Sequence, residues 1–193
     1  MALRGKVAII TGASSGIGAG IAVAFAKEGA NLSLTGRKQK NLEEVVKDCK
    51  KAGCQDVLTN VGDITQDAFR RTLVDTTKKK FGKIDILIPK DGLYTMSKAA
   101  LDIFTRYLAH ELVSHGVRVN SINPGYVPSQ LGSEVMTDEL QQSLINATPI
   151  GRAATPEEVG HIVVFLASDK AAFVTGECFK ADGGLSMTTP ALA

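Results

Sequence analysis

An eight-residue segment, TGASSGIG at residues 11–18, constrains the fold of this chain more than any other feature. It follows the apolar run KVAII and precedes an amphipathic helical pattern. Gly12 allows a tight turn, Gly16 lets the backbone approach a ligand closely, and Gly18 permits close packing at the helix start. The free N–H groups and partial positive charge of a helix N-terminus suit a phosphate. The segment therefore predicts a pyrophosphate-binding turn, with a plain glycine-rich turn as the alternative.

Strand-like apolar runs alternate with amphipathic helical patterns along the rest of the chain. The expected strands are residues 6–12, 31–37, 56–63, 83–88, 118–125 and 174–184. The expected helices are residues 16–30, 41–53, 66–82, 94–115 and 155–168. This alternation predicts an α/β fold with a doubly wound, Rossmann-like parallel sheet and helices on both faces. At 193 residues the chain is expected to form a single domain, residues 1–193.

The composition excludes several functional classes. A net charge of +2 without a basic stripe gives no indication of a nucleic-acid partner. No apolar run approaches the roughly 20 residues of a membrane span. The three cysteines are odd in number and lack the spacing of a metal site, so we expect no metal and a reduced, cytoplasmic environment.

The end of the second expected strand bears on the choice of dinucleotide. Sites for NAD usually place an acidic residue there to hold the ribose 2′-hydroxyl, whereas a nearby arginine suits a 2′-phosphate. This chain reads LTGRK, with no acid and with Arg37 and Lys38 instead. The pattern favours NADP(H), with NAD(H) as the less favoured cofactor. The alternative is that both cations form a solvated pair at a helix start.

A tyrosine and a lysine four residues apart form the next candidate. Tyr94 and Lys98 would lie one turn apart on the same face of a helix. A nearby ammonium favours the phenolate and lowers the pKa of a tyrosine from roughly 10 toward neutral pH, as acid–base catalysis requires. Taken alone this spacing is weak, and an exposed polar helix face would also explain it.

Together, TGASSGIG and the Tyr94–Lys98 pair resemble the short-chain dehydrogenase/reductase family. Further stretches extend the resemblance over nearly the whole chain: NVGDIT, INPGYVPS, TPIGRAATPEEV, VTGE and ADGG. The resemblance implies an NADP(H)-dependent oxidoreductase that acts on a small-molecule alcohol or carbonyl substrate, as a homo-oligomer if the full family fold is present. It implies neither a nucleic-acid nor a membrane partner.

The resemblance also assigns site residues. Tyr94 and Lys98 would be catalytic, and Lys98 would also hold the nicotinamide ribose. Val127 would offer backbone groups to the carboxamide, and Ser129 stands where the family usually has threonine. The complete set of expected cofactor-binding residues is Gly12, Ser14, Ser15, Gly16, Ile17, Gly18, Arg37, Asp63, Tyr94, Lys98, Pro124, Gly125, Val127 and Ser129.

One part of the family pattern is missing between Ile88 and Tyr94. There the family has an NNAG motif, a long helix with a catalytic Asn, and a strand that ends at the catalytic Ser. This chain has only PKDGL. We estimate the gap at about sixty residues, close to one helix–strand unit. Either the unit is deleted from the protein, or this sequence omits a segment that the protein contains. Ser97, which lies beside Lys98 on the expected helix, does not replace the missing serine.

Two functional hypotheses follow from this pattern. The first is hydride transfer between NADP(H) and an alcohol/ketone pair, with Tyr94 as the proton donor and acceptor. The second is a catalytically impaired or inactive deletion variant that retains nucleotide binding on the same fold.

Overall fold

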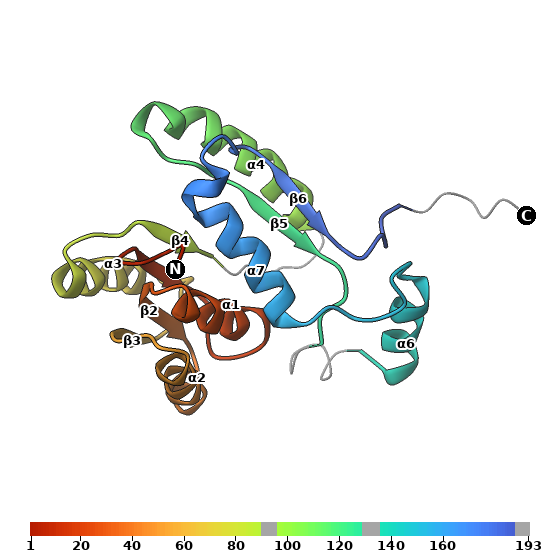
Figure 1. The fold of residues 1–193 in the computed structure, drawn as a ribbon, viewed down its shortest axis with the longest axis horizontal. Coiled ribbons are helices and arrows are strands. Elements are labelled where there is room, and N and C mark those ends of the chain that lie inside the picture. The colour runs from red at the N-terminus through yellow and green to blue at the C-terminus, as the bar shows by residue number, and fades with distance from the viewer. Residues whose placement is uncertain (90–95, 129–135, 188–193) are drawn as a thin grey trace, which may run out of the picture. The chain divides into compact units, whose positions relative to one another are not determined.

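The computed structural model describes residues 1–89, 96–128 and 136–187, and for residues 96–100 it describes the backbone alone (Figure 1). The strands are β1 (Val7–Ile10), β2 (Asn31–Gly36), β3 (Val57–Val61), β4 (Ile86–Ile88), β5 (Ser121–Pro124) and β6 (Cys178–Ala181). The helices are α1 (Gly16–Lys27), α2 (Gln39–Lys51), α3 (Asp67–Phe81), α4 (Met96–Leu112), α6 (Asp138–Ala147) and α7 (Pro156–Ala167), with short 3₁₀ helices η1 (Val113–His115) and η2 (Asp169–Ala171).

The chain divides into two compact units, each built from two separate segments. The first unit consists of Met1–Gly92 and Pro156–Ala171, and the second of Leu93–Thr155 and Ala172–Ala193. That all 193 residues form a single domain therefore stays a prediction.

The first unit contains a four-stranded parallel sheet in the order β3-β2-β1-β4. Strand β1 pairs in parallel with β2, with Val7 opposite Asn31, and also pairs in parallel with β4. All four residues of β1 are at most 2% exposed, as expected for a central strand covered on both faces. The predicted parallel pairing of the first two strands is confirmed.

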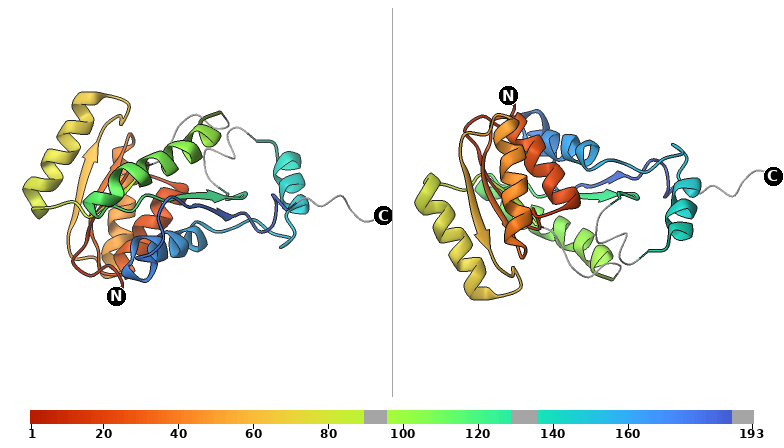
Figure 2. Two further views of the ribbon diagram at one scale, coloured as in Figure 1. Left: turned by 90° about the horizontal axis from the view of Figure 1, so that it is seen from above. Right: turned by 90° about the horizontal axis from the view of Figure 1, so that it is seen from below.

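Helices cover both faces of this sheet (Figure 2). Helix α3 lies on one side, and α1 packs with α2 and α7 on the other. Glycines allow the close α1–α7 contact. A Cβ atom on Gly20 would lie 2.5 Å from the Cβ atom of Pro156, and one on Gly160 would lie 2.9 Å from that of Ala24. The helix 155–168 expected from the sequence is therefore α7, and it completes the layer over α1.

A polar network joins β2, β3 and α3 beneath the surface. The hydroxyl oxygens of Ser33 and Thr77 lie 2.8 Å apart, and the Asn60 side chain donates to Ser33. Thr35, two residues after Ser33 on β2, is 1% exposed, and its hydroxyl has no hydrogen-bond partner among the described residues. A buried hydroxyl without a partner destabilises the fold by roughly 1–3 kcal/mol.

Replacing Thr35 with valine is therefore expected to raise the free energy of unfolding by about 1 kcal/mol, because valine fills the same space without a hydroxyl. Chemical denaturation measures the change. The matched control is Thr77→Val, which removes a fully buried hydroxyl that bonds Ser33 and the Leu73 carbonyl. That variant should lose stability by about 1–2 kcal/mol. Equal destabilisation of both variants would contradict an unpartnered Thr35 hydroxyl.

The second unit contains a two-stranded parallel sheet of β5 and β6, with α4 against β5. Ser121 lies opposite Cys178 and Pro124 opposite Ala181. The side chains of Arg118 and Asn120 both donate to the Val174 carbonyl, which ties the chain before β5 to the chain before β6.

Among the described residues, strands β4 and β5 each pair with another strand on one side only. Strand β4 is the last strand of the first sheet, and β5 is an end strand of the second. Leu87 on β4 is 59% exposed and Phe179 on β6 is 38% exposed, whereas β1 is completely buried. The α/β class with parallel strands is thus confirmed, with fewer strands than the full family sheet.

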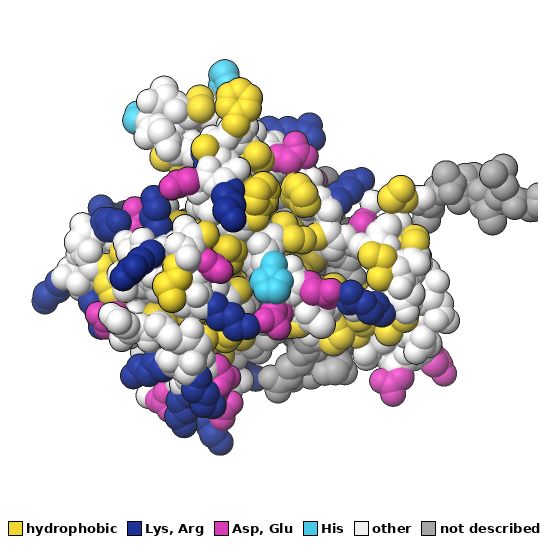
Figure 3. Space-filling model, in the orientation of Figure 1, with side chains coloured by type: hydrophobic (Ala, Val, Ile, Leu, Met, Phe, Trp, Pro, Cys, Tyr) yellow, Lys and Arg dark blue, Asp and Glu magenta, His cyan; other side chains and the backbone are white. Residues whose placement is uncertain are grey.

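Charges of both signs are mixed on the face of the first unit that Figure 3 shows. Figure 3 shows Lys and Arg side chains interspersed with Asp and Glu over the first unit. None of the helices among the described residues is both long enough and apolar enough to cross a membrane.

Candidate functional site

The glycine turn joins β1 to α1, and the structure explains why each of its three positions is glycine. Gly12 and Gly16 have φ angles of 61° and 56°, a region that residues with a side chain rarely adopt. A Cβ atom on Gly18 would overlap the carbonyl oxygen of Gly12. The third glycine is therefore required by the turn itself, which folds back onto the first turn of α1.

The N-terminus of α1 has the properties of an anion site. Ser15 precedes the helix, and its side chain makes no capping hydrogen bond to the described backbone. The first turn of α1, which includes Ile17, carries no acidic residue. The turn is anchored to β2, because the Ala13 N–H donates to the Thr35 carbonyl at 3.0 Å. Free N–H groups at the positive end of a helix on a fixed turn fit a pyrophosphate.

The end of β2 lies beside this turn. A Cβ atom on Gly36 would lie 2.9 Å from the Ser14 hydroxyl oxygen, so Ser14 and Gly36 are in close contact. The Gly36 carbonyl accepts the Gly62 N–H at 3.1 Å, which holds the end of β3 next to the end of β2. Arg37 is the first residue after β2 and is exposed. An acidic side chain at position 36 would displace Ser14, whereas glycine allows Ser14 to pack directly against the end of β2.

Asp63 follows β3 and is held as a carboxylate. The Thr65 N–H and the Thr65 hydroxyl both donate to its Oδ1 atom at 2.9 Å. These bonds, and to a smaller extent the positive charge of Arg37, hold the pKa of Asp63 below its usual value. An ionised carboxylate accepts hydrogen bonds, so Asp63 can take an N–H or O–H donor of a ligand, such as an adenine amino group.

The second unit carries the residues expected around the nicotinamide. Pro124 is the last residue of β5, and Val127, three residues later, is 9% exposed. A Cβ atom on Gly125 would lie 2.9 Å from the Cα atom of Asp182, so glycine is required beside the end of β6. The Gly125 N–H donates to the Ala181 carbonyl at 3.1 Å, which continues the β5–β6 pairing.

The two expected catalytic residues are only partly described. Lys98 lies in the first turn of α4, where the structure describes the backbone and not the side chain. Tyr94 and Ser129 lie outside the described residues. Their roles stay predictions from the sequence.

Sequence reasoning missed one polar residue of the second unit, Asp102. It is half-buried on α4, and its carboxylate accepts hydrogen bonds from Ser121 and Asn123 of β5. The sequence contained a pattern that could have indicated Asp102, because it follows Lys98 by four residues and Tyr94 by eight. That spacing places all three residues on one face of a regular helix.

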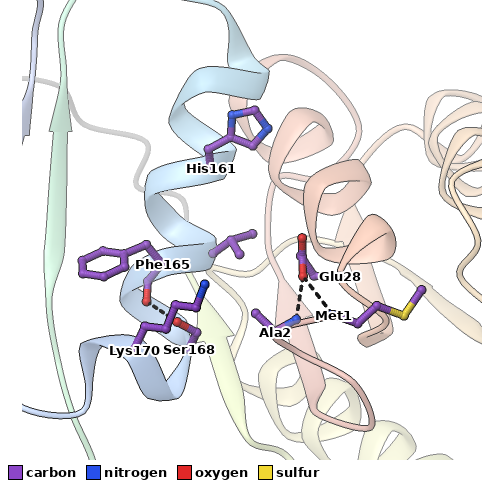
Figure 4. A pocket seen from close by; sticks show the side chains of 8 residues that line it. Met1, Ala2, Glu28, His161, Phe165, Ser168 and Lys170 are labelled. Carbon is purple, nitrogen blue, oxygen red and sulfur yellow. Dashed lines mark hydrogen bonds and ion pairs between the residues drawn. The ribbon is translucent and has the colours of Figure 1, made fainter.

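A hollow of about 600 Å³ lies elsewhere in the first unit (Figure 4). It lies at the C-terminal end of α1, about 18 Å from the glycine turn at 1.5 Å per helical residue. The Glu28 carboxylate beside it accepts the Ala2 N–H at 2.6 Å and lies 4.0 Å from the terminal ammonium group. Its one carboxylate, Glu28, is thus occupied by the N-terminus, and we assign the hollow no ligand. No metal-binding group of three His, Cys, Asp or Glu side chains occurs within residues 1–89, 96–128 and 136–187.

A parallel sheet with a glycine turn at a helix N-terminus defines an α/β protein of the Rossmann type. Two family models match the chain: "short chain dehydrogenase" over residues 6–93 and "Enoyl-(Acyl carrier protein) reductase" over residues 86–186. The chain belongs to the short-chain dehydrogenase/reductase family of oxidoreductases.

Individual relatives support this assignment. The chain is 28% identical to a 3-oxoacyl-[acyl-carrier-protein] reductase of Thermotoga maritima, over 96% of this chain and 99% of the relative. It is 30% identical to the apo form of glucose dehydrogenase of Caenorhabditis elegans, with a TM-score of 0.87 over 97% of this chain and 100% of the other. It is 28% identical to L-sorbose reductase of Gluconobacter frateurii, solved with NADPH and L-sorbose, with a TM-score of 0.87 over 98% and 99% of the two chains.

The same comparisons bear on the missing segment. The match to the Thermotoga reductase extends over 245 aligned positions, although this chain has only 193 residues. The relative therefore carries residues that have no counterpart here. The two family models meet at residues 86–93, where the sequence pattern placed the gap.

Proposed function

We propose that this protein binds NADP(H) and transfers a hydride between its nicotinamide and a small alcohol or ketone. The observation that carries the cofactor assignment is the end of β2. There Ser14 packs so closely on Gly36 that an acidic side chain at position 36 does not fit without movement of Ser14, and Arg37 supplies a cation close enough to affect Asp63. A guanidinium group can bind a phosphate through two parallel hydrogen bonds, which suits the 2′-phosphate of NADP(H).

The first unit would hold the adenosine half of the cofactor. The N–H groups of the turn at Gly12–Gly18 would bind the pyrophosphate, and Asp63 would accept a hydrogen bond from the adenine. The second unit would hold the nicotinamide half through Pro124, Gly125 and backbone groups of Val127, together with Ser129. Lys98 would bind the nicotinamide ribose.

The nicotinamide supplies or accepts the hydride, and the protein handles the proton. Tyr94 would donate a proton to the carbonyl oxygen during reduction and accept it during oxidation. Lys98, one helical turn away, would favour the phenolate and lower the pKa of Tyr94. This assignment rests on the family resemblance of YTMSK at residues 94–98.

Assembly and location are parts of the same proposal. Helix α4 exposes three large side chains: Ile103 at 71%, Phe104 at 53% and Tyr107 at 61%. Exposed apolar side chains on one helix are typical of a protein interface, which supports a homo-oligomer. We keep the cytoplasm as the predicted compartment, because of the three free cysteines.

The second candidate is a protein that binds NADP(H) but has little or no catalytic activity. The gap after β4 favours it, because the segment that the family has there carries the catalytic Ser and Asn. The glycine turn, Arg37 and Asp63 all precede the gap, so nucleotide binding survives under this alternative as well.

Replacing Arg37 with glutamine is expected to weaken NADPH binding about tenfold or more and to leave NADH binding unchanged. The chain has no tryptophan, so the change in the fluorescence of NADPH or NADH on titration with protein measures both affinities. Lys47→Gln is the matched control. It removes one positive charge at an exposed position in α2, the helix that follows Arg37, and should alter neither affinity. The double variant Gly36→Asp with Arg37→Gln should shift the preference toward NADH, although Ser14 must move to admit the carboxylate. An unchanged NADPH-to-NADH ratio in both variants would remove Arg37 from the site.

A further inference from the structure

We propose that Asp102 is a positioning residue that aligns helix α4 with the strand that leads to the nicotinamide. The inference rests on the proposed function, because it concerns how the two nicotinamide-side elements of the second unit are held together. Asp102 lies one helical turn after Lys98 on α4, and Asn123 immediately precedes Pro124 on β5. A fixed contact between Asp102 and Asn123 therefore sets the place of Lys98 relative to the segment 124–127.

The Asp102 carboxylate makes several hydrogen bonds to β5. The Ser121 hydroxyl donates to its Oδ1 atom at 3.3 Å, and the Asn123 amide nitrogen donates to both carboxylate oxygens at 3.3 Å. The Cys178 thiol of β6 lies 3.6 Å from the Asp102 main-chain carbonyl oxygen. One residue of α4 thus contacts both strands of the second sheet, within a single compact unit.

The polar residue types at this contact favour a role in alignment in addition to packing. Ser121 and Asn123 are two residues apart on β5, so their side chains leave the strand on the same face. In parallel sheets a face covered by a helix is usually apolar, and apolar side chains would be enough to hold α4 against β5. This chain instead has a hydroxyl, a carboxamide and a carboxylate, whose hydrogen bonds fix direction and register as well as distance.

Asn123 transmits this alignment to the cofactor segment. It is directly bonded to Pro124, and Gly125 is held against Asp182 without space for a side chain. A shift of Asn123 therefore moves the segment that would border the nicotinamide, while the glycine turn and Arg37 belong to the other unit. The part of the NADPH binding energy that comes from the nicotinamide should therefore depend on Asp102, and the part that comes from the adenosine should not.

Two ligands separate these halves in an experiment on the full 193-residue chain. NADPH contains the nicotinamide, whereas 2′,5′-ADP contains the adenosine and its 2′-phosphate without it. In Asp102→Ala, the affinity for NADPH is expected to fall about five- to tenfold, with the affinity for 2′,5′-ADP unchanged. Asp102→Asn keeps the shape and one acceptor oxygen, so it should show a smaller loss for NADPH alone and provides a folded variant if the alanine substitution prevents folding.

Glu111→Gln, an exposed carboxylate change on the same helix, is the matched control and should bind both ligands as the unmodified chain does. Equal weakening of both ligands in Asp102→Asn would overturn the positioning role and indicate a general loss of structure. Unchanged NADPH affinity in both Asp102 variants would overturn it as well. If the unmodified chain binds neither ligand, the proposed function itself is wrong, and the role of Asp102 falls with it.

Discussion

Insertion of a helix–strand segment of about sixty residues between Ile88 and Tyr94 is expected to raise ketone turnover by a factor of about 10² or more. The segment would restore the serine that polarises the substrate carbonyl and the asparagine that the family carries on the missing helix. The corresponding segment of the glucose dehydrogenase of Caenorhabditis elegans is a suitable donor, since that protein is 30% identical to this chain. Oxidation of NADPH in the presence of a panel of ketones measures the effect.

The same insertion should stabilise the fold. Strands β4 and β5 each end a sheet and are only partly buried, and Leu87 of β4 is 59% exposed. An inserted strand would cover apolar side chains of this kind, which stabilises a fold by about 25 cal/mol per Å² of apolar surface removed from water. Total stability is only about 5–15 kcal/mol, so this gain matters. The melting temperature is therefore expected to rise with the insertion and not with a Gly/Ser linker of equal length. If the unmodified chain already melts cooperatively and reduces ketones at a rate that the insertion does not raise, the missing segment is dispensable and this prediction is wrong.

Replacing Tyr94 with phenylalanine in the restored protein is expected to lower turnover by roughly 10²–10⁴-fold, because the phenol is the proton donor of the proposed reaction. NADPH should still bind, since the change removes one hydroxyl at the nicotinamide end of the site. Stopped-flow measurement of hydride transfer and fluorescence titration separate the two effects.

Tyr107→Phe is the matched control for this variant. Tyr107 lies on α4 and is 61% exposed, so loss of its hydroxyl should leave turnover unchanged. Near-normal turnover in Tyr94→Phe would exclude Tyr94 from the mechanism. Loss of NADPH binding together with turnover would assign it to binding instead of proton transfer.

Local features of the fold were predictable from the sequence, because local chemistry determines them. Gly12 and Gly16 adopt the positive φ angles for which glycine is the natural residue. The strand before them and the helix after them were indicated by periodicity alone. Helix α7 begins at Pro156, as proline at the first helical position predicts.

Features that depend on distant pairing were not predictable in the same way. The expected strand at residues 83–88 is only three residues long as β4, and the expected strand at 174–184 is four residues long as β6. A strand extends only as far as its neighbour pairs with it, and the pairs are distant in sequence: β4 pairs with β1, and β6 pairs with β5. The contact of Asp102 with Asn123 joins residues 21 positions apart, which no local pattern specifies.

The contribution of α7 to the first unit has a consequence for folding during synthesis. Helix α1 packs against α7, yet Gly20 and its contact Pro156 are separated by most of the chain. When residues 1–92 have left the ribosome, all four strands of the first sheet have been made, but α7, which packs against α1, has not. The first unit can be completed only after residue 171 emerges, and contacts of such high sequence separation form slowly. This interval is when chaperones would be expected to bind the newly made protein.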